Sequence, residues 1–531
     1  MTLRSWRAAS RRAASLPSIA AGLAVLLSVG CTTVPQESSF AGQDRVQTQS
    51  GLVSGVPTDS GMVYKGLPYA APPVGQMRWR SPEAPKPWSG VRVASEFGAP
   101  CAQGSLRGRT QISSISREDC LYLNVWTPEN SAAGRLPVMV WIHGGAFENG
   151  MGTSPTYDGT GLAGKGVIVV TINYRLGVFG FLAHPDLAAE SAHGSSGNYG
   201  LEDQLAALRW VQSNIAAFGG DPDNVTLFGQ SAGGASVRTL ISSPQSMGLF
   251  ARAIIQSGAS VSGLSAIPTS QAEQQGVALA GDMSIAQMRA LDVEDVIERS
   301  TAAKGRGIRF APAVDNYVVA ASEPTDGLQL PGGNIELLVG SNSREGLSAP
   351  SDQELDDALE RAFGPNVARA RQAYGLDGSP PTADRVLGTV AQQFGTDISF
   401  RCGAVALAEA AAQADVPIWQ YQFEHFVPGR EAQGAGHSFE VPYVFGNLSS
   451  TGFSAADYDE DDHRLAELMM SYWTNFAKQG DPNGPGLPEW PRFSNADKEY
   501  LRLTADLPGD AESAFALSGD ICPLIVAQER P

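Results

Sequence analysis

The stretch TLFGQSAGGAS, residues 226–236, holds the motif G-x-S-x-G with Ser231 at its centre. Residues 225–228 ahead of it are β-branched or apolar, as in a buried strand. Residues 232–240 behind it suit a helix, with small side chains first. A strand, a sharp turn and a helix are the setting in which a serine serves as a nucleophile, and glycines give such a turn its backbone freedom. The alternative is an ordinary serine, because the chain has 59 glycines and the motif can arise by chance.

Strands and helices alternate along the chain around this motif. Runs rich in β-branched and apolar residues predict buried strands at 136–145, 166–175, 252–258, 335–343 and 417–424. Helices are predicted at 199–220 and 463–480, and further helices within 270–310 and 351–415. Short alternating runs at 46–69 predict antiparallel strands at a sheet edge. The pattern predicts one large α/β domain with a mostly parallel sheet.

A serine nucleophile needs a base, and three histidines follow Ser231 in the chain. They are His425, His437 and His463. His437 is the preferred candidate, because small residues before it in GAGHSFEVPYVFG predict a loop, and catalytic side chains often lie on loops. His425, at the end of a predicted strand, remains open. His463 opens a charged helix, where a solvated role is expected.

The base in turn needs an acid, which lies between the nucleophile and the histidine in chain order in this type of fold. Glu345, in LLVGSNSREGLSA, follows a predicted strand and a polar turn, where an α/β sheet presents its functional loops. Asp315 and Asp397 are rivals that the residues alone do not separate from it.

Donors for a developing oxyanion are a further requirement of this chemistry. In WIHGGAF, residues 141–147, a predicted strand runs into glycines, as in the HGGG-type loops of esterases and lipases. The backbone amides of Gly145, Ala146 and Ala232 are therefore the candidate oxyanion hole. The alternative for His143 and its two glycines is a plain turn.

Charge and cysteine content narrow the partners and cofactors. The formal net charge of −18 argues against nucleic acid or anionic lipid as a partner. Four cysteines follow Cys31, and in an exported chain an even number suggests two disulfides with three possible pairings, the alternative being unpaired buried thiols. Their spacing fits no metal site, and neither a metal nor an organic cofactor is expected. The four are Cys101, Cys120, Cys402 and Cys522.

The N-terminus has the features of an export signal. Residues 1–30 contain a basic segment, an apolar stretch at about 19–29 and then small residues. Cys31 follows as in a bacterial lipoprotein cleavage site, which predicts a lipid anchor and membrane attachment; ordinary cleavage nearby is the alternative. Residues 31–45 suit a flexible tether and 46–531 the single domain. The chain is thus expected to leave a bacterial cytoplasm, as a periplasmic or outer-membrane lipoprotein or a secreted protein.

Several separate stretches together resemble the type-B carboxylesterases, the α/β-hydrolase family that includes cholinesterases and bacterial para-nitrobenzyl esterases. The resemblance covers about residues 46–525 and is carried by YKGLPYAAPPVGQMRWRSPEAPKPWSGV (64–91), EDCLYLNVWTP (118–128), WIHGGAF (141–147), NYRLGVFGFL (173–182), NYGLEDQ (198–204), FGQSAGG (228–234), GSNSREG (340–346), GAGHSFEVPYVFG (434–446) and NFAKQGDPN (475–483).

The resemblance implies an α/β-hydrolase fold and hydrolysis of a small-molecule carboxylic ester through an acyl-enzyme. It implies Ser231 as nucleophile, Glu345 as acid and His437 as base, with the three candidate amides as oxyanion donors. It also implies structural pairs, which are the disulfides Cys101–Cys120 and Cys402–Cys522 and the salt bridges Arg78–Glu118 and Arg175–Asp203.

Departures from the family pattern bear on the substrate. Gln230 stands where many relatives have Glu before the serine. This removes one negative charge beside the nucleophile, so a substrate-binding Gln230 would attract a cationic substrate less strongly. The segment between Cys101 and Cys120 holds no aromatic residue for cation–π recognition of a quaternary amine. A general carboxylesterase is expected rather than a cholinesterase. The alternatives are a non-catalytic binding protein of the same fold, and a hydrolase of a thioester, lactone or amide. Arg344 replaces a common acidic residue, with no evident effect.

Overall fold

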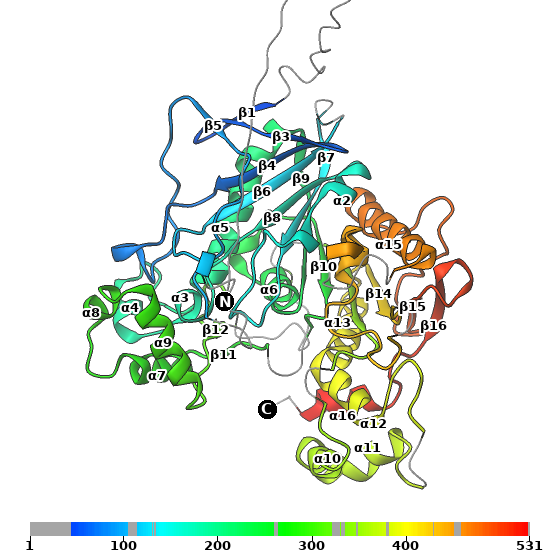
Figure 1. The fold of residues 1–531 in the computed structure, drawn as a ribbon. Helices are drawn as coiled ribbons and strands as arrows, with labels where there is room; N and C mark the ends of the chain where they lie inside the picture. The colour runs from blue at the N-terminus through cyan, green and yellow to red at the C-terminus, as the bar shows by residue number, and fades with distance from the viewer. Residues whose placement is uncertain are drawn as a thin grey trace, which may run out of the picture. The chain divides into compact units, whose positions relative to one another are not determined.

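A large mixed sheet runs through the computed structural model (Figure 1). The structure describes residues 44–528 except 105–113, 130, 132–133, 260–263, 321–329, 331–334, 347–348, 379–381, 428–429 and 451–457. The export signal, Cys31 and most of the tether lie outside these residues. All the described elements belong to one compact unit, Gly42–Pro531.

Within the described residues the sheet has eleven strands, parallel in its centre and antiparallel at both edges. The α/β-hydrolase expectation is thus confirmed. In spatial order the strands are β16 (Ala511–Phe515), β15 (Glu499–Leu503), β14 (Ile418–Phe423), β13 (Glu336–Asn342), β10 (Arg252–Gln256), β9 (Gly220–Gln230), β7 (Leu136–Ile142), β8 (Ile168–Ile172), β6 (Tyr122–Pro128), β4 (Gly61–Pro68) and β3 (Val56–Thr58).

Two smaller sheets accompany the main one in the described chain. Strands β1 (Arg45–Thr48), β2 (Gly51–Ser54) and β5 (Val91–Val93) form the first, and β11 (Ile267–Pro268) pairs with β12 (Ala313–Val314) in the second. The segment 46–69 therefore supplies antiparallel strands as predicted, but it divides them between two sheets, because β1 and β2 pair with β5 and not with β3 or β4.

Helices cover the sheet and extend beyond it in two groups. One group is α7, α8 and α9; the other is α10, α11, α12 and α16 (Figure 1). The helices are α2 (Thr160–Gly164), α3 (Gly177–Phe181), α4 (Pro185–Glu190), α5 (Tyr199–Asn214), α6 (Ala232–Ile241), α7 (Thr269–Ala280), α8 (Ile285–Arg289), α9 (Val293–Lys304), α10 (Leu355–Phe363), α11 (Val367–Ala373), α12 (Val390–Thr396), α13 (Cys402–Gln413), α14 (Val441–Phe445), α15 (Glu460–Gln479) and α16 (Ile521–Gln528).

The helix predicted at 199–220 ends earlier than its apolar pattern suggests. The α-helix stops at Asn214, a 3₁₀ turn covers Ile215–Phe218, and Gly219 adopts a left-handed conformation with φ 88°. Glycine adopts positive φ without a steric penalty, so it ends the helix and lets Gly220 begin β9.

One large hydrophobic cluster lies between the sheet and α15. Trp473 of α15 is fully buried together with Trp141 of β7, Phe228 of β9 and Tyr421 of β14. The ring centroids of Trp473 and Tyr421 are 5.3 Å apart in an edge-on arrangement, which is favourable for aromatic pairs. This packing fixes the central strands, and with them the loops at their carboxyl ends.

Covalent and ionic links agree with the structural pairs that the resemblance implies. Disulfides join Cys101 to Cys120 and Cys402 to Cys522. Two-pronged ion pairs join Arg78 to Glu118 and Arg175 to Asp203, with shortest distances of 2.6 and 2.7 Å.

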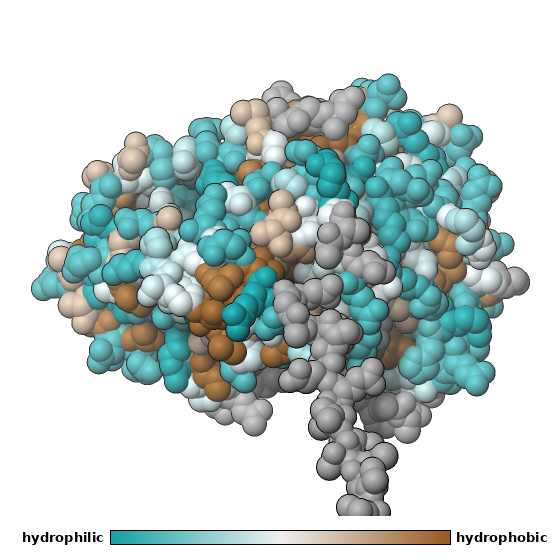
Figure 2. All heavy atoms as spheres, turned by 90° about the horizontal axis from the view of Figure 1, so that it is seen from above, coloured by the Kyte–Doolittle hydropathy of each residue, from teal (hydrophilic) through white to brown (hydrophobic). Residues whose placement is uncertain are grey.

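The face shown in Figure 2 is mostly hydrophilic, with limited hydrophobic areas between teal regions. Among the described residues, no helix combines the length and the hydrophobicity that crossing a membrane requires.

Candidate active site

Ser231 lies on a strained turn between β9 and α6. Its φ of 58° and ψ of −126° are unusual for a residue with a side chain. The turn is fixed by two backbone bonds: Ser231 N–H donates to Gln256 O of β10 (2.9 Å), and Ala235 N–H donates to Ser231 O (2.8 Å). The strand–turn–helix geometry predicted from the motif is therefore present.

Glycines around Ser231 permit contacts that a side chain would block. A Cβ on Gly233 would lie 2.0 Å from Ile142 O at the end of β7, and one on Gly229 would lie 2.6 Å from Gly233 C. A Cβ on Gly144 would lie 2.9 Å from Ser231 Cβ. The glycines therefore let the serine turn pack directly against the loop that follows β7.

Glu345 and His437 meet at the carboxyl ends of β13 and β14. Glu345 Oε2 is 2.6 Å from His437 Nδ1, and Oε1 accepts from Asn342 N–H (2.8 Å) and from the Ser257 hydroxyl (2.7 Å). Three donors thus hold the buried carboxylate in place. An ionised carboxylate only accepts, so Nδ1 carries the hydrogen that joins the ring to Glu345.

The other nitrogen of His437 faces the residue next to the serine. Nε2 lies 3.2 Å from the side-chain nitrogen of Gln230, and the Phe400 ring stacks on the imidazole with centroids 4.9 Å apart. Among the described residues, the Ser231 hydroxyl makes no hydrogen bond to His437. In unliganded hydrolases such bonds are often long and tighten only with substrate.

The loop after β7 presents amides beside the serine turn. Gly145 and Ala146 both have positive φ, 118° and 57°. Ala232 is the first residue of α6, where the helix leaves its N–H groups unpaired. None of these three amides donates a hydrogen bond within the described part of the chain. The three predicted donors therefore remain available for an anion.

His143 stabilises this loop through contacts of its ring and its backbone carbonyl. Nδ1 contacts Gly144 O at 2.8 Å, the Tyr174 hydroxyl donates to His143 O at 2.9 Å, and the His143 and Tyr174 rings stack at 4.5 Å. Burial lowers the pKa of His143 to about 4, so its ring is neutral at pH 7. His143 is thus a structural part of the loop.

A second buried carboxyl, Glu440, lies three residues after His437. It accepts from Asn342 Nδ2 (2.7 Å) and Gln256 Nε2 (3.2 Å). Burial and the negative charge of Glu345 raise the pKa of Glu440 to about 7. Asn342 binds both carboxyl groups, one through its backbone and one through its side chain, and so links them.

Arg344 fixes the loop that carries His437. Its guanidinium donates to five backbone carbonyls in two segments, 384–386 and 431–432. Its own N–H donates to Ala435 O at 3.0 Å. The unexplained arginine beside Glu345 therefore joins the acid, the His437 loop and the 384–386 loop.

The rival acids have structural partners. Asp315 accepts three backbone N–H bonds, from residues 317–319, as in a tight turn. Asp397 pairs with Arg401 at 2.6 Å and accepts from the Tyr374 hydroxyl. Asp397 also lies beside the sulfur atoms of the second disulfide, which leaves no free thiolate there for a metal.

The rival histidines lie apart from Glu345. His425 Nε2 is 2.8 Å from Asp462, which also accepts from the Tyr443 hydroxyl. His463 is exposed on α15. Among the three histidines that follow Ser231, only His437 contacts both Glu345 and Gln230.

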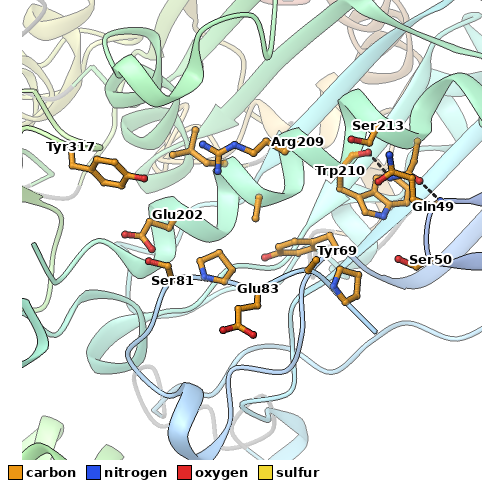
Figure 3. Close-up of a pocket in the computed structure, with 16 residues that line it drawn as sticks. Gln49, Ser50, Tyr69, Ser81, Glu83, Glu202, Arg209, Trp210, Ser213 and Tyr317 are labelled. Atoms are coloured by element: carbon orange, nitrogen blue, oxygen red, sulfur yellow. Dashed lines mark hydrogen bonds between the residues drawn. The ribbon is translucent and has the colours of Figure 1, made fainter. Parts of the chain in front are cut away.

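Two cavities differ in their relation to these residues. The cavity in Figure 3, of about 430 Å³, lies among Tyr69, Glu202, Arg209 and Trp210, and none of the candidate catalytic residues lines it. A smaller one, of about 280 Å³, is bordered by His437 and mainly by aromatic and aliphatic side chains. These include Tyr157, Phe426, Val427, Phe439, Val441, Pro442, Tyr443 and Tyr458.

The sequence did not indicate the supporting roles of four residues: Ser257, Asn342, Glu440 and Arg344. Ser257 lies near the end of the predicted strand 252–258, and Asn342 near the end of 335–343, so strand ends were the available signal. Glu440 stands in the same motif as His437. The contacts of Arg344 join positions 40 or more residues apart, as for Asp384 and Arg385, and no local pattern indicates them.

Comparison with known proteins places these features in a family. The sequence profile of the carboxylesterase family matches residues 42–514. The fumonisin B1 esterase of Sphingopyxis macrogoltabida is 37% identical, with 89% of each chain covered. The para-nitrobenzyl esterase of Bacillus subtilis is also 37% identical, over 87% of this chain and 95% of its own. A solved PNB esterase structure superposes with a TM-score of 0.76 at 34% identity, covering 91% of this chain and all of that one.

Proposed function

Because this chain belongs to the carboxylesterase family and hydrolyses carboxylic esters, we propose that it does so through an acyl-enzyme formed on Ser231. In this proposal Glu345 and His437 complete a catalytic triad. The amides of Gly145, Ala146 and Ala232 form the oxyanion hole.

Acylation begins with proton transfer from the Ser231 hydroxyl to His437 Nε2, as Oγ attacks the ester carbonyl carbon. Glu345 accepts from Nδ1–H throughout, keeps Nε2 free as the base and stabilises the imidazolium that forms. The carbonyl oxygen becomes an oxyanion and accepts from the three amides. Collapse breaks the bond to the alcohol oxygen, and His437 Nε2–H donates its proton to the leaving alcohol.

Deacylation repeats the same steps with water. His437 takes a proton from the water as the water oxygen attacks the acyl carbon, and the second oxyanion uses the same amides. The proton then returns to Ser231 Oγ, and the carboxylic acid leaves.

The 2.6 Å contact between His437 Nδ1 and Glu345 Oε2 is the observation that carries this proposal. It occurs where strand ends bring residues 92 positions apart beside the serine turn, and the rival acids and histidines have other partners.

Neutral esters with an apolar group are the proposed substrate class. The cavity beside His437 is lined mainly by aromatic and aliphatic side chains, which favour an uncharged group. Gln230 adds no negative charge that would attract a cation. The ester substrate is therefore proposed to be a neutral small molecule.

Hydrolysis of p-nitrophenyl esters of increasing acyl length tests the proposal, with the wild type beside Ser231→Ala. We expect activity in the wild type and loss of nearly all of it in the variant at an unchanged melting temperature. Ser242→Ala is the matched control, because it removes a buried hydroxyl that makes no hydrogen bond within the described residues. Activity in Ser231→Ala equal to the wild type would contradict the proposal.

Further measurements distinguish ester hydrolysis from two other functions. A fluorophosphonate labels an activated serine and not an ordinary one, so labelling at Ser231 excludes a non-catalytic binding protein. Matched ester, thioester, lactone and amide substrates then rank the bond that is cleaved, and we expect the ester to give the highest kcat/KM.

Export and domain boundaries complete the proposal. Residues 1–30 are proposed to be a signal peptide, 31–45 a tether and 46–531 one domain, with lipid on Cys31. Mass spectrometry of the mature N-terminus tests this, because a lipidated N-terminal Cys31 has a mass that simple cleavage does not give.

A further inference from the structure

Gln230 occupies the space between His437 and the oxyanion loop. It is the last residue of β9, and only 3% of its surface is exposed. Its Nε2 lies 3.2 Å from His437 Nε2, and a Cβ on Gly144 would lie 3.0 Å from its Oε1. The amide nitrogen therefore points to the histidine and the amide oxygen to the loop.

The donor and acceptor roles follow from Glu345. Its carboxylate accepts from Nδ1–H, so the neutral ring has a lone pair on Nε2. A lone pair needs a donor, and the Gln230 NH₂ group is the donor that the structure offers. A carboxylate at this position could not donate to the neutral ring and would hold only the protonated one.

Two carboxyl groups and one amide face His437, each from a different part of the fold. Glu345 follows β13, Glu440 precedes α14, and Gln230 ends β9, while the π-helical turn Asp397–Arg401 contributes the uncharged Phe400 ring. Two carboxyl groups are thus already close to the imidazole. A carboxylate at position 230 would favour the imidazolium further.

We propose that Gln230 is a positioning residue that holds His437 as a neutral base in the resting enzyme by donating from its side-chain amide to Nε2. This inference rests on the proposed function, because it needs His437 to act as the base. When the ester binds, Nε2 exchanges this donor for the hydroxyl of the adjacent Ser231. Gln230 thus pairs the lone pair of Nε2 until the serine hydroxyl takes its place.

Gln230→Glu is the principal test, measured as kcat/KM for p-nitrophenyl acetate from pH 4.5 to 9 at a wavelength where nitrophenol and nitrophenolate absorb equally. The acid limb of this profile reports the base of the free enzyme. We expect it to move up by about one pH unit or more, because the added carboxylate stabilises the imidazolium. At high pH the activity returns to within a few-fold of the wild type.

Gln230→Met keeps the approximate volume and removes the donor. We expect the acid limb of kcat/KM to move up by about half a pH unit, because the neutral ring of the free enzyme loses the donor that favours it over the imidazolium. Because Nε2 faces Ser231 in the ester complex, the plateau kcat should stay close to that of the wild type. Gln413→Glu is the matched charge control, since it adds the same charge at an exposed position on α13. Its acid limb should coincide with that of the wild type.

Two results would overturn the inference: an acid limb of Gln230→Glu that coincides with that of the wild type, or an acid limb of Gln230→Met that does so. Stoichiometric labelling by a fluorophosphonate separates this from failure of the proposed function. A wild type that labels at Ser231 and hydrolyses esters retains the proposed function even if both variants contradict the role of Gln230.

Discussion

Replacing Glu345 with glutamine should invert the proton position on His437. Oε1 already accepts from Asn342 N–H and the Ser257 hydroxyl, so the carbonyl oxygen of a glutamine would stay there. Its NH₂ group would then face Nδ1, where Oε2 now lies at 2.6 Å. A donor facing Nδ1 makes that nitrogen the acceptor and moves the ring proton to Nε2. The ring could then accept no proton from Ser231.

The expected loss follows from this geometry. The wrong tautomer in a comparable triad costs about 10⁴ in kcat, which corresponds to ~5.5 kcal/mol at about 1.4 kcal/mol per factor of ten. Glu345 is only 2% exposed, so solvent compensates little for the lost charge. We expect kcat of Glu345→Gln to fall by about 10³ to 10⁴, with KM changed less than about threefold, because the carboxylate contacts the base and not the ester.

The assay is hydrolysis of p-nitrophenyl acetate at pH 8, with the protein concentration determined from ultraviolet absorbance and the melting temperature measured in parallel. Glu345→Asp is the control, since it keeps the charge but moves it back by one methylene, and we expect a loss of only about 10- to 100-fold. A kcat of Glu345→Gln above a tenth of the wild type would refute the reasoning, because Glu345 would then not fix the tautomer.

Three further changes test packing, charge and loop support. Gly233→Ala should lower the unfolding free energy by more than about 3 kcal/mol in urea titrations, because its Cβ would lie 2.0 Å from Ile142 O. Gly378→Ala is the control. A Cβ there meets nothing within 4 Å, so it should change the unfolding free energy by less than about 1 kcal/mol. The raised pKa of Glu440, about 7 against 4.5, gives stability that is complete below pH 4.5 and lost as the pH rises through 7. Unfolding titrations should therefore show that the wild type loses more unfolding free energy between pH 5 and pH 8 than Glu440→Gln does, by about 3 kcal/mol. Arg344→Met should lower the melting temperature and reduce kcat about tenfold with KM nearly unchanged, because the His437 loop loses its ties, and a kcat equal to the wild type would contradict this.

Local sequence patterns were sufficient for much of the fold. The G-x-S-x-G motif between a strand and a helix predicts the turn at Ser231, and the carboxyl ends of predicted strands indicate where Glu345 and His437 lie. These signals are local, since each depends on a run of neighbouring residues. The resemblance to a family then singled out Glu345 from Asp315 and Asp397, which composition and spacing did not do.

Sequence patterns did not indicate the contacts between distant segments. Nothing near Gln230 indicates that its amide meets a ring 207 positions later, and nothing near Arg344 indicates carbonyls at 384–386 and 431–432. The early end of α5 depends on a left-handed Gly219, which competes with an apolar pattern that would continue the helix. In each case a tertiary contact or one backbone conformation decided the outcome.

The two groups of inserted helices affect how this chain can diversify. Helices α7–α9 lie in the connection between β10 and β13, and α10–α12 lie in the connection between β13 and β14. Each connection begins and ends at a strand of the parallel centre, where pairing fixes the register. A gene segment encoding one helical group can therefore be exchanged for a homologous segment of another length while the strand ends keep their places. Exchange of the α10–α12 group also replaces the 384–386 carbonyls that bind Arg344, so it would alter the support of the His437 loop, whereas exchange of the α7–α9 group leaves those contacts in place.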